Sequence, residues 1–307
     1  MLDGRAVQPG LVISSFGRHV SVETPDGRLV TCHPRGKRNQ AVVGDRVSWL
    51  ASADQGTIES IEKRRNLFFR QDEVRIKSFA ANLDQILILI AARPSFSEAQ
   101  LAHALIAAEA QGIHALIALN KQDLSADFAL AWRRLETYRR MGYQVLPLSL
   151  MHGGEDELQG LLQQLDGKAT LVLGPSGSGK SSLINRLIPG AMVRTEQISE
   201  ALNAGRHTTT RTTWHWLDRS RGCALIDSPG FQAFGLHHLD PMALAACLPD
   251  FRPYLEQCRF HNCTHLHEPG CGVLRAIADT DQNSGIASSR HRLYASLFTL
   301  LSQAPRY

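Results

Sequence analysis

The sequence predicts a multidomain protein with an N-terminal β-barrel, a central α/β domain and a C-terminal, mainly helical domain that binds a metal. Three observations predict this arrangement. Short alternating runs separated by turns come first, buried apolar strands then alternate with helical patterns, and cysteines gather with histidines near the C-terminus. The expected boundaries are 1–70 for the barrel, 71–80 for a linker, 81–235 for the α/β domain and 236–307 for the C-terminal domain.

The barrel is predicted from short runs that alternate apolar and polar residues. They are LVISSFGRHVSVET, RLVTCHP, VVGDRVSWL and GTIESIEK, and Pro25-Asp26-Gly27 is a strong turn signal between the first two. Short, regularly spaced strands without a helical stretch are typical of small barrels. Strand content and basic charge fit an oligonucleotide-binding (OB) fold, although an SH3-like barrel has a similar pattern.

The charge of the chain is unevenly distributed. Residues 1–80 hold 13 Lys and Arg against 9 Asp and Glu, and the remainder holds 20 against 20, which accounts for the net charge of +4. This excess favours an anionic partner such as nucleic acid, and a solvated basic face is an equal alternative. The N-terminus lacks a signal peptide and the apolar runs are too short to cross a bilayer, so we expect a cytoplasmic protein without a membrane partner. We also expect it to be a monomer.

A phosphate-binding loop is predicted at GPSGSGKS, between the strand TLVL and the helix SSLINRLI. Its backbone N–H groups would hold the α- and β-phosphates, Lys180 would reach the β- and γ-phosphates, and the Ser181 hydroxyl would bind Mg²⁺. The pattern by itself does not separate ATPases, GTPases and kinases. The predicted nucleotide contacts here are Gly174, Pro175, Ser176, Gly177, Ser178, Gly179, Lys180, Ser181 and Ser182.

The motif NKQD (Asn120 to Asp123) follows the apolar run IHALIAL and predicts recognition of guanine. A carboxylate such as Asp123 can accept hydrogen bonds from the N1–H and N2–H₂ groups of guanine, a donor pair that adenine lacks. Asn120 could pair with the O6/N7 side, and the stem of Lys121 could lie on the purine ring. Ser149, at the next strand end, could add a base contact. A simple helix cap after a strand is the alternative for the motif.

Two further motifs predict the groups around the γ-phosphate. In DSPG, Asp227 would bind Mg²⁺, generally through water, and Gly230 would offer its N–H to the γ-phosphate. In GRHTTT, Thr209, with Thr208 as the alternative, would complete the Mg²⁺ shell. Phe231 occupies the place where many GTPases have a water-orienting glutamine, so His207 is a candidate for that task, and an exposed switch histidine without a catalytic role is an equal alternative. The candidate catalytic residues are Lys180, His207 and Thr209.

The order of these motifs predicts a circular permutation. The base-recognition motif precedes the phosphate loop, and the threonine switch and DSPG follow. A sheet tolerates such a change when its natural termini lie close together. The permutation also places DSPG directly before the C-terminal domain, and we expect loss of the γ-phosphate to be transmitted there.

A structural zinc site is predicted from three thiols and one imidazole, Cys258, Cys263, His265 and Cys271. Such a Cys₃His set fills a tetrahedral shell and leaves no position open for catalysis. His261 and His267 are competitors for the imidazole position, and free buried cysteines are the alternative reading.

The permuted order, GPSGSGKSS, DSPGF, GRHTTT and the spacing C-x₄-C-x-H-x₅-C resemble the RsgA (YjeQ) family of small ribosomal subunit biogenesis GTPases. The resemblance covers nearly the whole chain. It implies an OB-fold, a permuted P-loop GTPase domain with Mg²⁺ and GTP, one structural Zn²⁺, and a partner composed of rRNA and ribosomal proteins. It also implies GTP hydrolysis stimulated by the small subunit during late maturation, with His207 positioning water. The family loop usually has Val where this chain has Ser178.

The expected function is therefore that of an enzyme converting GTP to GDP and phosphate. A GTP-dependent rRNA-binding module with little turnover is the alternative, because the usual glutamine is absent. A P-loop ATPase or kinase is a weaker third hypothesis, since NKQD argues against it.

Overall fold

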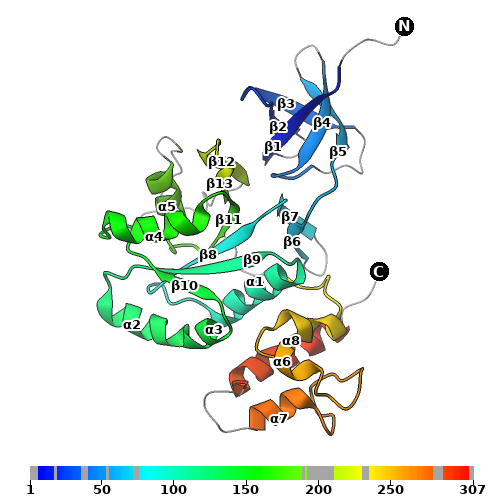
Figure 1. Ribbon diagram of the computed structural model, residues 1–307, viewed down its shortest axis with the longest axis vertical. Helices are drawn as coiled ribbons and strands as arrows, with labels where there is room; N and C mark the ends of the chain where they lie inside the picture. Colours follow the sequence, from blue (N-terminus) through cyan, green and yellow to red (C-terminus); the bar gives the residue numbers. More distant parts are fainter. Residues whose placement is uncertain are drawn as a thin grey trace, which may run out of the picture.

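The structure is a computed structural model that describes residues 6–16, 19–35, 41–52, 55–71, 76–188, 191, 211–229, 235–278 and 286–303. Figure 1 shows three parts one above another, with the barrel at the top, the α/β domain in the middle and the C-terminal helices at the bottom. This arrangement agrees with the order of parts predicted from the sequence. In the described ranges no helix combines the length and apolar composition needed to cross a bilayer.

The barrel is five-stranded and has the strand order β1-β2-β3-β5-β4, closed by pairing of β4 with β1. The β3–β5 pair is parallel and the other pairs are antiparallel. This closed order with one parallel pair is the OB arrangement rather than the SH3-like alternative. Its strands are β1 (Gln8–Phe16), β2 (His19–Glu23), β3 (Leu29–Pro34), β4 (Arg46–Ala51) and β5 (Gly56–Ile61).

A hairpin follows the barrel, in the stretch expected to act as a linker. Its strands are β6 (Leu67–Gln71) and β7 (Ile76–Ala81). It joins the barrel, because Ala81 N donates to Val43 O at 2.9 Å. It also joins the start of the C-terminal part, because Gln71 N donates to Gly235 O and Gln71 O accepts from His237 N. The segment expected as a linker is therefore a hairpin with backbone hydrogen bonds to both the barrel and the C-terminal part.

The central sheet has the order β10-β9-β8-β11-β13-β12, and all its pairs are parallel except β12–β13. All residues of β8 and of β11 are buried, as expected for strands covered on both faces. Its strands are β8 (Gln85–Ala91), β9 (His114–Asn120), β10 (Gln144–Pro147), β11 (Ala169–Leu173), β12 (Thr213–Asp218) and β13 (Cys223–Asp227).

Helices cover both faces of this sheet, because alternate strand residues belong to different cores. Ile86 and Ile88 pack in the core that contains α1, whereas Leu87 and Leu89 pack in the core that contains α4 and α5. Ser97 caps the start of α1, since Ser97 Oγ accepts from Gln100 N. The helices are α1 (Glu98–Ala110), α2 (Ser125–Arg134), α3 (Glu136–Arg140), α4 (Glu155–Leu165) and α5 (Lys180–Leu187).

The C-terminal part packs on the α1 face and shares its core, to which Phe251 and Tyr294 contribute. A partly exposed ion pair, Arg252 with Glu109 of α1, lies at this contact. Inside the C-terminal part, Arg290 and Asp250 form a mostly buried pair at 3.0 Å. Its elements are the 3₁₀ helix η1 (Pro241–Cys247) and helices α6 (Arg252–Leu255), α7 (Gly272–Ala278) and α8 (Ser288–Gln303).

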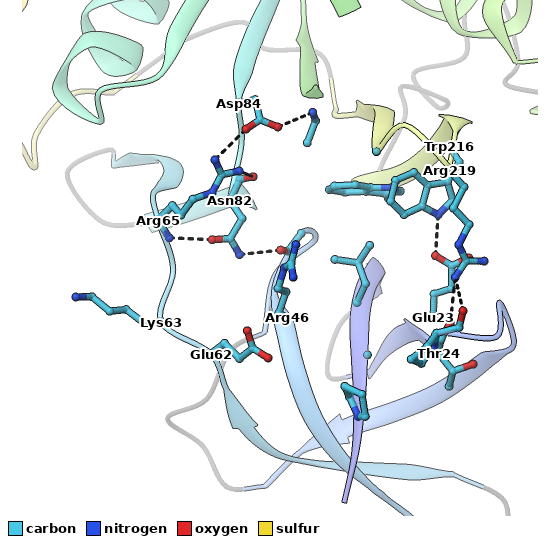
Figure 2. Close-up of a pocket in the computed structure, with 18 residues that line it drawn as sticks. Glu23, Thr24, Arg46, Glu62, Lys63, Arg65, Asn82, Asp84, Trp216 and Arg219 are labelled. Carbon is cyan, nitrogen blue, oxygen red and sulfur yellow. Dashed lines mark hydrogen bonds and ion pairs between the residues drawn. The ribbon is translucent and has the colours of Figure 1, made fainter. Parts of the chain in front are cut away.

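The barrel docks on β12 and extends the central sheet, since Ser14 of β1 pairs with Thr213. Figure 2 shows Trp216 and Arg219 reaching Glu23 of the barrel. Trp216 Nε1 donates to Glu23 Oε2 at 2.7 Å, and Arg219 pairs with Glu23 Oε1 at 3.1 Å. These contacts border a cleft of about 650 Å³ whose walls include residues at the amino ends of β8 and β11.

The Glu23 contacts predict that Glu23→Ala loosens the barrel. The substitution leaves the Trp216 N–H without its acceptor, and we expect a loss of about 1–3 kcal/mol in the free energy of unfolding. Chemical denaturation followed by tryptophan fluorescence measures this loss. Glu59→Ala is the matched control, because Glu59 pairs with Arg35, whose side chain is 71% exposed. Equal stability of the two variants would contradict the assigned role of Glu23.

Candidate nucleotide and metal sites

The phosphate loop lies at the carboxyl end of β11 and leads into α5, which begins at Lys180. Gly177 and Gly179 have φ angles of 77° and 98°, in the left-handed region that favours glycine. At Gly179 a Cβ atom would lie 2.3 Å from Asn120 Nδ2. The glycines thus allow the loop to curve closely against the neighbouring strand end, and Ser181 and Ser182 follow in the first turn of α5.

Lys180 and Asp227 meet at the centre of the site. Lys180 Nζ lies 2.9 Å from Asp227 Oδ1 and 2.7 Å from Ser228 O, and both side chains are buried. A nucleotide phosphate is a natural partner for the ammonium group, and a divalent cation is one for the carboxylate. The sheet therefore places a phosphate-binding cation beside a candidate magnesium ligand, although 47 residues separate them in the sequence.

Asn120 links the phosphate loop to the loop after β10. Its Nδ2 donates to Ser178 O at 2.9 Å, and its Oδ1 accepts from Leu150 N at 3.1 Å. The side chain is almost fully buried. The sequence indicated a base contact for Asn120 and gave no sign of this bridging role. A buried amide with partners on both sides holds the two loops at a fixed separation.

Asp123 and Ser149 lie together, as their proposed common target requires. Ser149 Oγ donates to Asp123 Oδ1 at 2.8 Å, which leaves the other carboxylate oxygen for a ligand. Lys121 has a φ of 69°, and its ammonium group donates to Arg93 O. The structure thus brings all four predicted base-recognition side chains to the carboxyl edge of the sheet, beside the phosphate loop.

Ser178 departs from the valine that is usual in the resembling family, and its backbone remains engaged. Ser178 N donates to Pro175 O, and Ser178 O accepts from Asn120. Its hydroxyl is buried and has no hydrogen-bond partner among the described residues. Ser178 therefore places a buried hydroxyl inside the loop while its backbone N–H and carbonyl are both hydrogen-bonded.

His207, Thr208, Thr209, Gly230 and Phe231 lie outside the described residues, so their predicted roles remain predictions. The strands that flank them are described. Thr213 at the start of β12 pairs with Asp227 at the end of β13. On β12, burial lowers the pKa of His215, and the charge of Asp227 opposes that effect.

The predicted metal ligands converge. One ligand atom from each of Cys258, Cys263, His265 and Cys271 lies within 4.8 Å of the others. His265 Nδ1 is 3.5 Å from Cys258 Sγ and from Cys271 Sγ, and the latter two sulfurs are 3.9 Å apart. A tetrahedral zinc site with Zn–S bonds of about 2.3 Å has ligand separations of about 3.5–3.8 Å, so the set fits the ion. His265 is thus preferred over His261 and His267.

Backbone donors surround these sulfurs. Gly272 N donates to Cys258 Sγ at 3.3 Å, and Leu274 N donates to Cys271 Sγ at 3.4 Å. Burial raises the pKa of Cys263 to about 12, so a thiolate there needs a nearby cation. Tyr294 OH of α8 donates to Thr264 O beside the ligands. This hydrogen bond connects the loop of residues 258–271, which carries the four ligands, to the last helix.

Comparison with known proteins agrees with this geometry. The RsgA GTPase family model matches residues 61–237. The small ribosomal subunit biogenesis GTPase RsgA of Variovorax paradoxus (strain S110) is 59% identical over 98% of this chain and 94% of its own length. The protein of the same name from Burkholderia pseudomallei (strain K96243) is 50% identical over 97% of this chain and 93% of its own length. This chain belongs to the RsgA GTPase family.

Two solved structures share its fold. The crystal structure of YjeQ from Thermotoga maritima has a TM-score of 0.75 and 28% identity, and the match covers 98% of this chain and all of that chain. YloQ, described as a circularly permuted GTPase, has a TM-score of 0.70 and 26% identity, and the match covers 100% of this chain and 99% of that one. This RsgA family member is accordingly a circularly permuted GTPase, and it hydrolyses GTP. The permutation predicted from the order of the motifs is confirmed.

The position of Asp123 predicts that Asp123→Asn weakens GTP binding at least about tenfold, the worth of a hydrogen bond to a charged group. The amide group of the new asparagine would place an N–H donor opposite the amino group of guanine, which is itself a donor. Xanthine has a carbonyl oxygen in place of that amino group, so the affinity for xanthosine triphosphate (XTP) should rise. Nucleotide titration with GTP, XTP and ATP measures this. Asp127→Asn is the control, because Asp127 pairs with Arg93 on the surface. An unchanged preference would contradict the guanine assignment.

The Cys₃His cluster predicts one zinc ion per chain. Cys263→Ser should lose the ion and unfold the C-terminal part, because removing a ligand leaves buried thiols without a cation. Native mass spectrometry and hydrogen exchange over residues 235–303 measure both effects. His267→Ala is the matched control and should keep the ion, since exposed His267 is not part of the cluster. Full zinc occupancy in Cys263→Ser would contradict the assignment.

Proposed function

We propose that this GTPase acts in late maturation of the small ribosomal subunit and that the subunit stimulates its hydrolysis of GTP. The observation that carries the proposal is similarity over nearly the full chain to proteins named small ribosomal subunit biogenesis GTPase. The alignment includes the barrel and the C-terminal part as well as the nucleotide domain. The parts that would contact a partner are therefore present together with the catalytic part.

The nucleotide site would bind GTP through the residues placed at the carboxyl edge of the sheet. The loop from Gly174 to Ser182 would hold the phosphates, and Asp123, with Ser149 and Lys121, would hold the guanine. Ser181, Asp227 and Thr209 would bind Mg²⁺, which would neutralise phosphate charge in the bound nucleotide. The buried Asp227 carboxylate beside Lys180 supports this assignment. His207 would orient the attacking water, because Phe231 has no hydrogen-bonding group.

The barrel offers a short route from RNA to this site. Its basic residues would bind rRNA phosphates, with affinity that falls as salt rises. Barrel residue Ser14 pairs with Thr213, and Thr213 pairs with Asp227, the candidate magnesium ligand. Arg211, just after the threonine switch, lies over the ring of Phe16, with 5.3 Å between the guanidinium carbon and the ring centroid. RNA that moved the barrel would therefore act on β12, which follows the threonine switch, and on β13, which leads into DSPG.

We assign residues 1–70 to an RNA-binding barrel, 81–235 to the GTPase domain and 236–307 to a zinc domain. Residues 71–80, in the β6–β7 hairpin segment, link the barrel to the GTPase domain. The zinc is structural, and the protein works as a monomer in the cytoplasm, where bacterial subunits are assembled. Transmission of γ-phosphate loss into the C-terminal part remains a prediction, because residues 230–234 lie outside the described chain.

Turnover of GTP by the purified protein tests the proposal. We expect slow hydrolysis alone, strong stimulation by purified small ribosomal subunits, and neither effect with ATP, because Asp123 selects guanine. His207→Ala should abolish the stimulation while GTP binding remains. Tight GTP binding without turnover in either condition would instead favour an rRNA-binding module, and stimulation with ATP would favour a general P-loop ATPase.

A further inference from the structure

The loop from Ser149 to Gly153 connects β10 to α4 and carries the hydroxyl that contacts Asp123. Loops at the edge of a sheet move more readily than the strands they join. The position of the Asp123 carboxylate therefore depends on the contacts that hold this loop in place. Two charged side chains from two helices do so, and the sequence motifs indicated neither of them.

Arg186 of α5 holds the loop from the side of the phosphate-binding helix. Its Nη1 donates to Leu150 O at 2.8 Å and lies 3.4 Å from Ser149 O, and its Nη2 donates to Gly153 O at 2.8 Å. A guanidinium has several donors in one rigid plane, so it can bind carbonyl oxygens at both ends of a short loop at once. A lysine has a single ammonium group at the same position and cannot do the same.

Glu157 of α4 holds the same loop from a second helix. Its Oε2 accepts from Ser149 N at 2.8 Å. Gly153 closes the turn, since Gly153 N donates to Ser149 O at 2.7 Å, and a Cβ there would lie 2.3 Å from Ser149 O and 2.5 Å from Glu157 Oε2. The backbone of Ser149 thus has a charged partner on its N–H and a close turn on its carbonyl.

We propose that Arg186 is a positioning residue for guanine specificity, acting on the base through the Ser149 loop and Asp123. Arg186 belongs to α5, the helix that begins at the phosphate loop. Its hydrogen bonds therefore also fix where the loop from Ser149 to Gly153 lies relative to the phosphate loop. The proposal rests on the assignment of Asp123 as the guanine acceptor under the proposed function. Arg186 itself touches the loop carbonyls and no reacting atom.

A purely structural role for Arg186 would lower the affinity for every nucleotide alike. A positioning role affects the guanine amino group selectively, because Asp123 would accept its hydrogen bond from that group. Inosine diphosphate lacks this amino group and otherwise matches GDP. The ratio of the dissociation constants for IDP and GDP therefore reports on the Asp123 contact, whereas affinity for GDP alone does not.

The experiment measures binding of GDP and IDP, each with Mg²⁺, to the full chain by calorimetry. We expect the wild type to prefer GDP by about tenfold, the worth of one hydrogen bond to a charged group. In Arg186→Gln the ratio should fall close to one, and in Arg186→Lys it should be intermediate. Arg133→Gln is the matched control, because Arg133 is exposed on α2, and it should keep the wild-type ratio.

Three outcomes would overturn the proposal. If Arg186→Gln melts like the wild type and keeps its IDP-to-GDP ratio, Arg186 does not position Asp123, although the guanine assignment stands. If the wild type itself binds GDP and IDP equally, the guanine contact fails and the role of Arg186 fails with it. Should Arg186→Gln melt early, Glu157→Gln tests the same loop from the other helix, and an unchanged ratio there and in Arg186→Lys also overturns the proposal.

Discussion

Parallel pairing of β11 with β8 on one side and β13 on the other places the ends of three distant chain segments at one edge of the sheet. Asn120 ends β9, which pairs with β8, and Asp227 ends β13. The pairing depends on strand direction and on burial of both faces, and chain order has no part in it. A permuted chain can therefore assemble the same nucleotide site as an unpermuted one.

In the described part of the chain, the outer edge of β12 would have no partner strand without the barrel. Exposed edge strands are prone to pair with other chains, and here β1 supplies the partner. The contact is short, and Glu23 reinforces it with Trp216 and Arg219. As a result the barrel attaches to the strand that follows the threonine switch. The barrel, in the most basic part of the chain, and Asp227 of the nucleotide site therefore pair with the same strand, β12.

The C-terminal part depends on two different stabilising features. Its apolar residues, among them Phe251 and Leu297, join the core on the α1 face. The loop of residues 258–271 has little regular structure, and a metal held by four converging ligands would fix it. The contact of Tyr294 with Thr264 then ties that loop to α8. Core packing and metal ligation together allow a short segment of few helices to keep one arrangement.

The sequence by itself determined the parts of this protein and most of its candidate ligands. Apolar runs with period-two or continuous burial predicted the strands, and the glycine loop, NKQD and DSPG predicted the site, because local residue types and spacing carry that information. The zinc ligands could be chosen for the same reason, although the choice among His261, His265 and His267 required the geometry.

Only the tertiary structure decided how these parts hold one another. Asn120 as a bridge between loops, Arg186 as a clamp on the Ser149 loop, and the docking of β1 on β12 all join residues far apart in the sequence. The hairpin β6–β7 was expected only as a linker, because its pairing partners lie in the barrel and beyond β13. No local pattern marks such contacts, since each depends on where a distant carbonyl or strand edge lies after folding.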